Sequence, residues 1–175
     1  RKNVKELWND INSSSTNFFI NEAFIDFIRK GEDLSFKHFE SDRVIIIRAF
    51  TKFFGIPGLR LGYSICYNKK WVSTANNLKE PWTINTFAAS CGEFLLNSNK
   101  FIEKTYKTLE KEKNRMLNGL TKIKNIRVFK SESNFLLIKL MEISGTELYN
   151  KLLEKGFLIR RCENFNFLDD SYVRI

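Results

Sequence analysis

The sequence predicts an α/β domain followed by a smaller α+β domain. A β-branched run at residues 44–50, VIIIRAF, has polar flanks, which is typical of a strand buried on both faces. A long amphipathic helix is expected at 98–119. Beyond it, strand-like segments surround one amphipathic helix at 145–156, which indicates an α+β module. We therefore place the domains at residues 1–97 and 98–175, and the second domain begins with the long helix as a bridge.

Hydrophobic periodicity and turn residues place the remaining elements. In the first domain we expect a helix at 2–12, a strand at 17–20, a brief helical segment that stops at Gly31, a strand at 62–67, and helices at 69–79 and 82–97. In the second domain we expect strands at 127–130, 134–140, 157–161 and 172–175 around the helix at 145–156.

Composition and charge restrict the class of protein. With 175 residues and 43% hydrophobic residues, the chain can form a real core and is expected to be globular. The net charge is +9, but lysines and glutamates alternate at helical spacing in residues 101–124, which favours a solvated helix face over a nucleic-acid surface. We see no stretch of transmembrane length and no apolar signal core in the first residues, so we expect a cytoplasmic protein without a membrane partner.

Metal and histidine-based chemistry are not expected. The cysteines number three and lie far apart, and the single histidine, His38, lies in the polar segment SFKHFESD, where it should be exposed. No metal site can be assembled from this spacing, and neither a Ser-His nor a Cys-His pair is indicated. Arg1 is not a translation start, so we expect the chain to be a piece of a longer protein.

The most informative segment is RAFTKFFGIPGLRLGY, residues 48–63. Lys52 follows a predicted strand, and Arg60 stands eight residues later, after a loop that contains Gly55 and Pro57. A strand-end lysine can form a Schiff base with a carbonyl compound, and an arginine can clamp a phosphate through its planar fork of donors. Pyridoxal phosphate carries both an aldehyde and a phosphate.

Residues 51–62, TKFFGIPGLRLG, resemble the segment S/T-K-x-x-G-x-x-G-x-R-x-G of the aspartate-aminotransferase superfamily of pyridoxal-phosphate enzymes, fold type I. The chain is similar to the later half of such an enzyme, in particular to the threonine-phosphate decarboxylase and histidinol-phosphate aminotransferase branch. The resemblance implies that the first domain is part of the large three-layer cofactor-binding domain and the second is the small domain. It also implies that Lys52 holds pyridoxal 5'-phosphate and that Thr51 and Arg60 bind the cofactor phosphate.

Two further positions of the cofactor site follow from the resemblance. INEAFIDF, residues 20–27, is similar to the family's D-E-A-Y/F segment, whose aspartate supports the protonated ring nitrogen, but here that position is Asn21. A carboxylate holds this proton by charge whereas an amide can only hydrogen-bond, so the electron sink should be weaker. Phe24 is expected to pack near the ring, or otherwise to be an ordinary core residue. Ala49 stands where many relatives have a hydroxyl that binds the phosphate, so one phosphate contact should be lost.

The substrate residues are also inferred by resemblance. EPWTIN, residues 80–85, resembles a P-W-x-x-N segment near the substrate entrance, which implies a role for Asn85, although the same asparagine suits a helix cap. Arg160 and Arg174 match the two arginines of the small domain. Arg174 would receive the α-carboxylate and Arg160 a second anionic group, although Arg160 could instead be a surface arginine paired with Glu163.

The resemblance implies decarboxylation of L-threonine O-3-phosphate to an amino-alcohol phosphate, a cobalamin side-chain precursor. The alternative enzyme is an aminotransferase of histidinol phosphate or a related amino acid. An alternative of another class is an inactive fragment or binding module that retains the fold, which Asn21 and Ala49 favour. Relatives usually work as homodimers, so a homodimer is expected of the full-length form.

Overall fold

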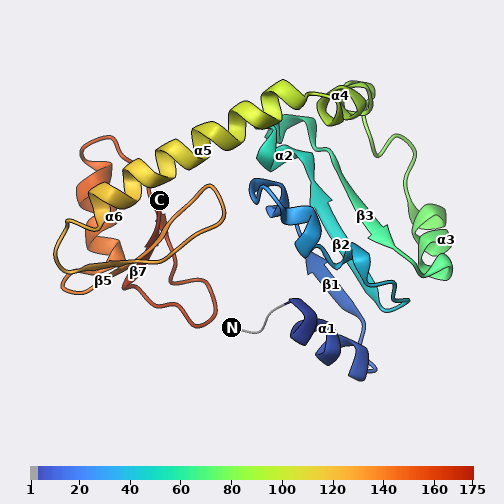
Figure 1. Cartoon of the computed structure of the whole chain (residues 1–175), viewed down its shortest axis with the longest axis horizontal. Helices are drawn as coiled ribbons and strands as arrows, with labels where there is room; N and C mark the ends of the chain where they lie inside the picture. Colours follow the sequence, from blue (N-terminus) through green and yellow to red (C-terminus); the bar gives the residue numbers. More distant parts are fainter. Residues whose placement is uncertain (1–3) are drawn as a thin grey trace. The chain divides into compact units, whose positions relative to one another are not determined.

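The computed structural model describes residues 4–175, so residues 2 and 3 of the helix expected at 2–12 lie outside the described part. The chain divides into two compact units, with the boundary between Phe101 and Ile102. Helix α5, Asn99–Leu120, begins in the first unit and continues into the second (Figure 1). Each unit has its own sheet and its own core.

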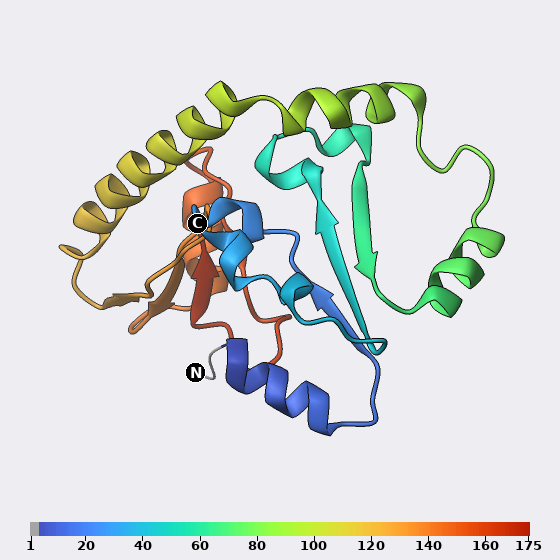
Figure 2. The same cartoon turned by 45° about the vertical axis from the view of Figure 1, so that its right-hand side comes forward.

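The sheet of the first unit has the strand order β1-β2-β3, and the strands lie side by side in both views (Figures 1 and 2). Its strands are β1 (Phe18–Asn21), β2 (Val44–Ala49) and β3 (Gly62–Cys66). β1 and β2 are parallel, with Asn21 opposite Ile47, and β3 is antiparallel to β2, with Gly62 opposite Ala49. The carboxyl ends of β1 and β2 therefore meet at one edge of the sheet.

One face of this sheet is covered by the amphipathic helix α1, Val4–Ser13, and by the segment that precedes β2. The side chains of this core, which alternate along β1 and β2, are joined by Ile11 and Trp8 of α1. Trp8 stacks on Phe39 with ring centroids 4.8 Å apart. The buried members of the cluster are Ile11, Phe36, Val44 and Ile46. Because each of these side chains loses its contact with water, each contributes roughly 1.5–3 kcal/mol relative to an exposed position.

The other face of β2 is open, so the prediction of a strand buried on both faces is wrong for this chain. Ile47 is 43% exposed and Phe19 of β1 is 69% exposed, whereas Val44 and Ile46 are 2% and 1% exposed. An apolar run reports which side chains can be buried and does not supply the layer that buries them. Among residues 4–175 no layer buries Ile47.

The helices after the sheet begin at asparagine caps. Asn68 Oδ1 accepts hydrogen bonds from the backbone of Lys70 and Trp71 at the start of α3, Lys69–Leu78. Asn85 caps α4, Thr86–Leu96. These side chains satisfy backbone N–H groups that have no partner within the first turn, which explains why both helices begin where they do.

The segment after β1 is not a regular helix. The helical segment expected to stop at Gly31 consists of 3₁₀ turns at Ile25–Phe27 and Gly31–Leu34, followed by a third at Phe36–His38. The chain returns so closely at Gly31 that a Cβ there would lie 2.3 Å from the carbonyl oxygen of Ile25. This tight packing favours short 3₁₀ turns over a continuous α-helix.

The second unit is a four-stranded antiparallel sheet of order β4-β5-β7-β6 with helix α6, Gly145–Leu153. Its strands are β4 (Ile126–Val128), β5 (Leu137–Leu140), β6 (Arg160–Arg161) and β7 (Tyr172–Arg174). Ile138, Leu140 and Val173 form its core, with Leu120 and Leu148 packed against them. β6 is shorter than the predicted strand at 157–161, because Phe157 and Leu158 are exposed and unpaired with the sheet.

Within the described residues, every helix is too short or too polar to span a bilayer.

Candidate functional site

Lys52 lies immediately beyond the carboxyl end of β2. The strand ends at Ala49 and passes directly into the one-turn helix α2, Phe50–Phe53, which carries Lys52. Its Nζ lies 5.9 Å from the centroid of the Phe24 ring, and Phe24 follows the carboxyl end of β1. The neighbouring strand ends thus bring Lys52 and Phe24 together. An exposed lysine beside an aromatic face is accessible to a flat, electrophilic ligand.

A closed loop brings Arg60 back to the start of α2. The backbone N–H of Phe50 donates to the carbonyl of Leu61 at 3.2 Å, so the chain neighbours of Thr51 and Arg60 are hydrogen-bonded. Gly55 has a φ of 65°, and the 3₁₀ turn Pro57–Leu59 completes the loop. Thr51 and Arg60 therefore lie at the same end of the sheet.

The backbone of Arg60 is strained. Its φ is 53°, in the left-handed region that non-glycine residues seldom adopt. Such a conformation costs about 1–3 kcal/mol and persists only where the surroundings impose it. One guanidinium nitrogen donates to the carbonyl of Pro57 at 3.0 Å, while the side chain remains exposed. The other donors of the guanidinium can still bind an anion.

Asn21 ends β1 at the same edge. Its Oδ1 accepts a hydrogen bond from the backbone N–H of Ala23 at 3.0 Å, and its side chain is exposed. Ala49, at the end of β2, supplies no hydroxyl. The structure therefore brings Asn21, Phe24, Thr51, Lys52 and Arg60 to one end of one sheet. Position 21 carries a neutral amide and not a carboxylate.

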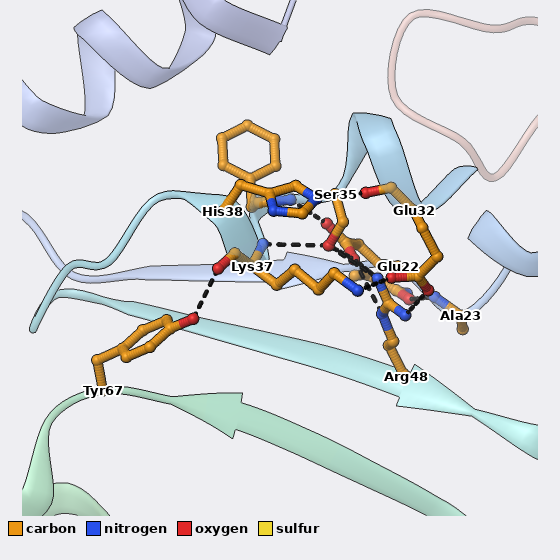
Figure 3. A network of polar contacts seen from close by, with 10 residues as sticks. Glu22, Ala23, Glu32, Ser35, Lys37, His38, Arg48 and Tyr67 are labelled. Atoms are coloured by element: carbon orange, nitrogen blue, oxygen red, sulfur yellow. Dashed lines mark hydrogen bonds and ion pairs between the residues drawn. The ribbon is translucent and has the colours of Figure 1, made fainter. Parts of the chain in front are cut away.

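Sequence analysis missed a buried polar network beside this edge (Figure 3). Arg48 is 3% exposed, and its guanidinium donates to Glu22 Oε2 at 2.9 and 3.1 Å and to Ser35 Oγ at 2.7 Å. Glu22 Oε1 accepts from the backbone N–H of Phe36 at 2.7 Å. Glu32 bridges Arg48 and Lys37. A charged residue inside the apolar run 44–50 was the available signal, because a buried charge requires a partner.

Hydrogen bonds in the network favour the charged forms of Arg48 and Glu32. Burial opposes the charge on Arg48, but hydrogen bonds to Glu32, Tyr63 and Glu22 outweigh it and raise the pKa of Arg48 above its ordinary value. Burial likewise opposes ionisation of Glu32, but hydrogen bonds to Arg48 and Lys37 lower the pKa of its carboxyl. Nearby Asp26 differs, because its burial raises the pKa of that carboxyl. Arg48 is thus a fixed cation that joins β2 to the segment after β1.

Asn85 acts as a helix cap. Its Oδ1 accepts from the backbone N–H of Ala88 at 2.9 Å, and its Nδ2 donates to the carbonyl of Leu59 at 3.2 Å. The second bond ties the start of α4 to the loop that carries Arg60. Trp82 lies in the preceding turn with a φ of 57° and is 93% exposed, so it does not pack within this unit.

Arg160 and Arg174 are directly opposite each other on β6 and β7. Arg160 donates to the neutral side chain of Asn164 at 3.0 Å, and the Arg174 guanidinium lies 4.7 Å from the centroid of the Phe135 ring. Within residues 4–175, neither forms an ion pair with a carboxylate. Like charges opposite each other destabilise a sheet, so an anion bound between them would be stabilising.

The alternative partner for Arg160 is not observed. Glu163 pairs with Arg161 at 3.0 Å instead. Arg161 also donates to Thr146 Oγ1 at 2.9 Å, and its guanidinium lies 5.4 Å from the centroid of the Tyr149 ring. Arg161 therefore fastens β6 to helix α6, while Arg160 shares a sheet position with Arg174.

No cluster of three or more histidine, cysteine or acidic side chains with metal-binding geometry occurs within the described residues. His38 is exposed, as predicted, and its Nε2 lies 2.8 Å from the carbonyl oxygen of Glu32. The described cysteines are free, and burial raises the pKa of the Cys162 thiol.

The comparison with protein families decides the assignment. The model of the aminotransferase class I and II family matches residues 1–175. The chain belongs to this family. A histidinol-phosphate aminotransferase from Clostridium acetobutylicum, whose crystal structure is known, is 39% identical with a TM-score of 0.87, over 98% of this chain and 51% of that chain. The predicted fold class, fold type I, is thereby confirmed.

Relatives within the family carry two different names. A protein of Caldanaerobacter subterraneus with a provisional threonine-phosphate decarboxylase name is 38% identical over 89% of this chain and 43% of its own length. A histidinol-phosphate aminotransferase of Methanocaldococcus jannaschii is 33% identical over 94% of this chain and 44% of its own length. The chain thus spans about half the length of the family members it matches.

Proposed function

We propose that this chain carries the lysine-bearing half of a pyridoxal-phosphate enzyme that decarboxylates L-threonine O-3-phosphate to an amino-alcohol phosphate. One observation carries the proposal. Lys52 Nζ lies beside the Phe24 ring at the carboxyl edge of two parallel strands, within a segment that matches the family's lysine segment. Ligands of α/β sheets bind at this edge. Membership of the aminotransferase class I and II family supports a pyridoxal-phosphate enzyme, and the likeness to the Caldanaerobacter subterraneus protein supports decarboxylation.

The residues at this edge fit two groups of the cofactor, its aldehyde and its phosphate. Lys52 Nζ would hold the cofactor aldehyde carbon, and Phe24 would pack beside the ring. The Thr51 hydroxyl and the free donors of Arg60 would bind the phosphate, with one contact fewer because position 49 is alanine. Asn21 would face the ring nitrogen. Its amide differs chemically from the family's aspartate.

Two arginines suit a substrate with two anionic groups. By family resemblance, Arg174 would bind the α-carboxylate and Arg160 the phosphate, and Asn85 would border the substrate while it caps α4. The absence of carboxylate partners for both guanidinium groups within the described residues supports this role. Arg161 would keep β6 in place through its bonds to α6.

The bound cofactor supplies an electron sink for a bond that breaks at the α-carbon. In decarboxylation the bond to the carboxylate breaks, carbon dioxide leaves, and a proton is added at the α-carbon. Lys52 Nζ would be the group at this edge of the sheet that delivers this proton. The residues that orient the substrate would therefore decide which bond breaks.

A second candidate function is transamination of histidinol phosphate or a related amino acid. The likeness to the Clostridium acetobutylicum histidinol-phosphate aminotransferase favours it. Product analysis separates the two functions. Carbon dioxide and an amino-alcohol phosphate indicate decarboxylation, and consumption of a keto acid indicates transamination.

By the same resemblance we propose that residues 1–97 are part of the large cofactor-binding domain and that residues 98–175 are the small domain. We also propose that the full-length protein is a cytoplasmic homodimer. Sedimentation equilibrium of that protein would measure its mass in solution, and a monomer would contradict the dimer.

Covalent labelling tests the role of Lys52. The chain is incubated with pyridoxal phosphate, reduced with borohydride, digested and examined by mass spectrometry. We expect the reduced cofactor on Lys52, no label at this position in Lys52→Arg, and an undiminished label on Lys52 in the control Lys70→Arg, which changes an exposed lysine of α3. Equal labelling of Lys70 and Lys52, or none on Lys52, would contradict the proposal and would favour an inactive fragment that retains the fold.

A further inference from the structure

Asn21 is placed where it can meet the ring of a ligand held by Lys52. It is the last residue of β1 and lies opposite Ile47, just before the end of the parallel strand β2. Three residues later, the Phe24 ring contacts Lys52 Nζ. Asn21 therefore leaves the sheet at the edge that carries the lysine, and its side chain is exposed at that edge.

The orientation of the Asn21 amide follows from one hydrogen bond. The backbone N–H of Ala23 donates to its Oδ1 at 3.0 Å. A backbone N–H can only donate, so the atom that it meets must be the carbonyl oxygen, which identifies the two ends of the amide. The Nδ2 group, with two hydrogens and no capacity to accept, is left without a partner among residues 4–175.

The turn that fixes this orientation is locked by Glu22. Its backbone N–H donates to the carbonyl of Ile47 at 2.9 Å, and its carbonyl accepts from Ile25 at 3.0 Å. Its side chain is 7% exposed and accepts a hydrogen bond from the backbone N–H of Phe36. Ser35 and Arg48 also donate to it, as Figure 3 shows. A rearrangement of the turn after Asn21 would disturb this buried ion pair, which is costly when one partner is lost.

We propose that Asn21 is a hydrogen-bond donor to the ring nitrogen of the cofactor and holds that nitrogen unprotonated. This inference rests on the proposed function. If the ring nitrogen were protonated, its N–H would face the Nδ2 hydrogens of Asn21. Both groups are donors, so neither would have an acceptor. An unprotonated nitrogen offers its lone pair to Nδ2. A carboxylate at this position would impose the opposite state, because it stabilises a cationic ring by charge.

With an unprotonated ring nitrogen, the cofactor in this chain would differ electronically from a cofactor held by an aspartate at this position. An unprotonated ring withdraws less electron density from the α-carbon, so bond cleavage there should be slower than with an acid at position 21. Asn21→Asp should move the ring nitrogen to its protonated form. Ala23 can still donate to one carboxylate oxygen, and the second oxygen can accept from the ring.

Nitrogen NMR tests the protonation state without any measurement of activity. Pyridoxal phosphate labelled with ¹⁵N in the ring is bound to the chain, and its chemical shift is compared with those of free pyridine and pyridinium forms. We expect the unprotonated shift in the wild type, the protonated shift in Asn21→Asp, and the wild-type shift in Asn77→Asp. The last variant adds the same charge at an exposed position of α3.

The outcomes separate this inference from the proposed function. A bound label with a protonated nitrogen in the wild type would overturn the inference and leave the cofactor role of Lys52 intact. A label that the protein does not retain would overturn both. The wild-type measurement decides the question even if Asn21→Asp does not fold.

Discussion

Arg48 shows how much of this site depends on a single buried cation. Its partners are Glu22 in the turn after β1 and Glu32 and Ser35 near the 3₁₀ turns that follow. Arg48 thus connects both of these stretches to β2. Removing one member of a buried pair leaves the other charge desolvated and uncompensated. Removal of one partner therefore lowers the free energy of unfolding strongly, even where the intact pair adds little to stability.

We therefore expect Arg48→Met to lower the free energy of unfolding by about 3–5 kcal/mol, because Glu22 would remain buried without its cation. Urea denaturation measures this change. Arg115→Met is the matched control, since Arg115 is 70% exposed and forms an ion pair with Glu112 of the same helix. Its loss should be much smaller than that of Arg48→Met. Equal losses in the two variants would show that the Arg48 network is not a stabilising unit.

At the residue level, the sequence indicates candidate chemical groups but not their environments. Lys52 and Arg60 are candidates because they lie in one segment of fixed spacing, and Asn21 because it lies in a second such segment. The orientation of the Asn21 amide was not predictable, because it depends on a single turn bond to Ala23. The partners of Arg48 were also hidden, since Glu22 and Ser35 lie 26 and 13 residues away along the chain.

At the level of elements, helix α4 begins at Asn85, which combines a cap with a link to the Arg60 loop. We expect Asn85→Ala to destabilise the start of α4 by about 0.5–2 kcal/mol, because the first turn loses its acceptor. Asn85→Asp keeps the acceptor and should retain most of the stability. Hydrogen exchange of the Ala88 amide measures the effect. Unchanged protection in Asn85→Ala would contradict the capping role.

The elements themselves were predictable where local signals were strong. α3 and the long helix α5 were expected within a residue of their observed ends, because the amphipathic pattern is continuous. Prediction failed where tertiary contact decides the local structure. The close return at Gly31 converts a helical pattern into 3₁₀ turns, and the exposed Phe157 and Leu158 leave β6 with only two residues.

At the scale of the whole molecule, each compact unit has a core of its own, one around Ile46 and one around Ile138. Ile46 is 1% exposed and Ile138 is 4% exposed, so truncation of either to alanine should cost about 2–5 kcal/mol. All the tryptophans, Trp8, Trp71 and Trp82, belong to the first unit. Their emission therefore reports the unfolding of that unit alone.

These features allow a matched pair of variants to test whether the units are separate cooperative structures. Because each core lies within one unit, Ile46→Ala should shift the tryptophan transition in urea to a lower concentration, whereas Ile138→Ala should leave it nearly unchanged. Far-ultraviolet circular dichroism also follows α5 and α6, so it should show a transition at lower urea concentration in both variants. If Ile138→Ala shifted the tryptophan transition as much as Ile46→Ala does, the chain would unfold as one cooperative structure. The sheet edge that carries Lys52 and the pair Arg160 and Arg174 of the second unit would then gain or lose their order together.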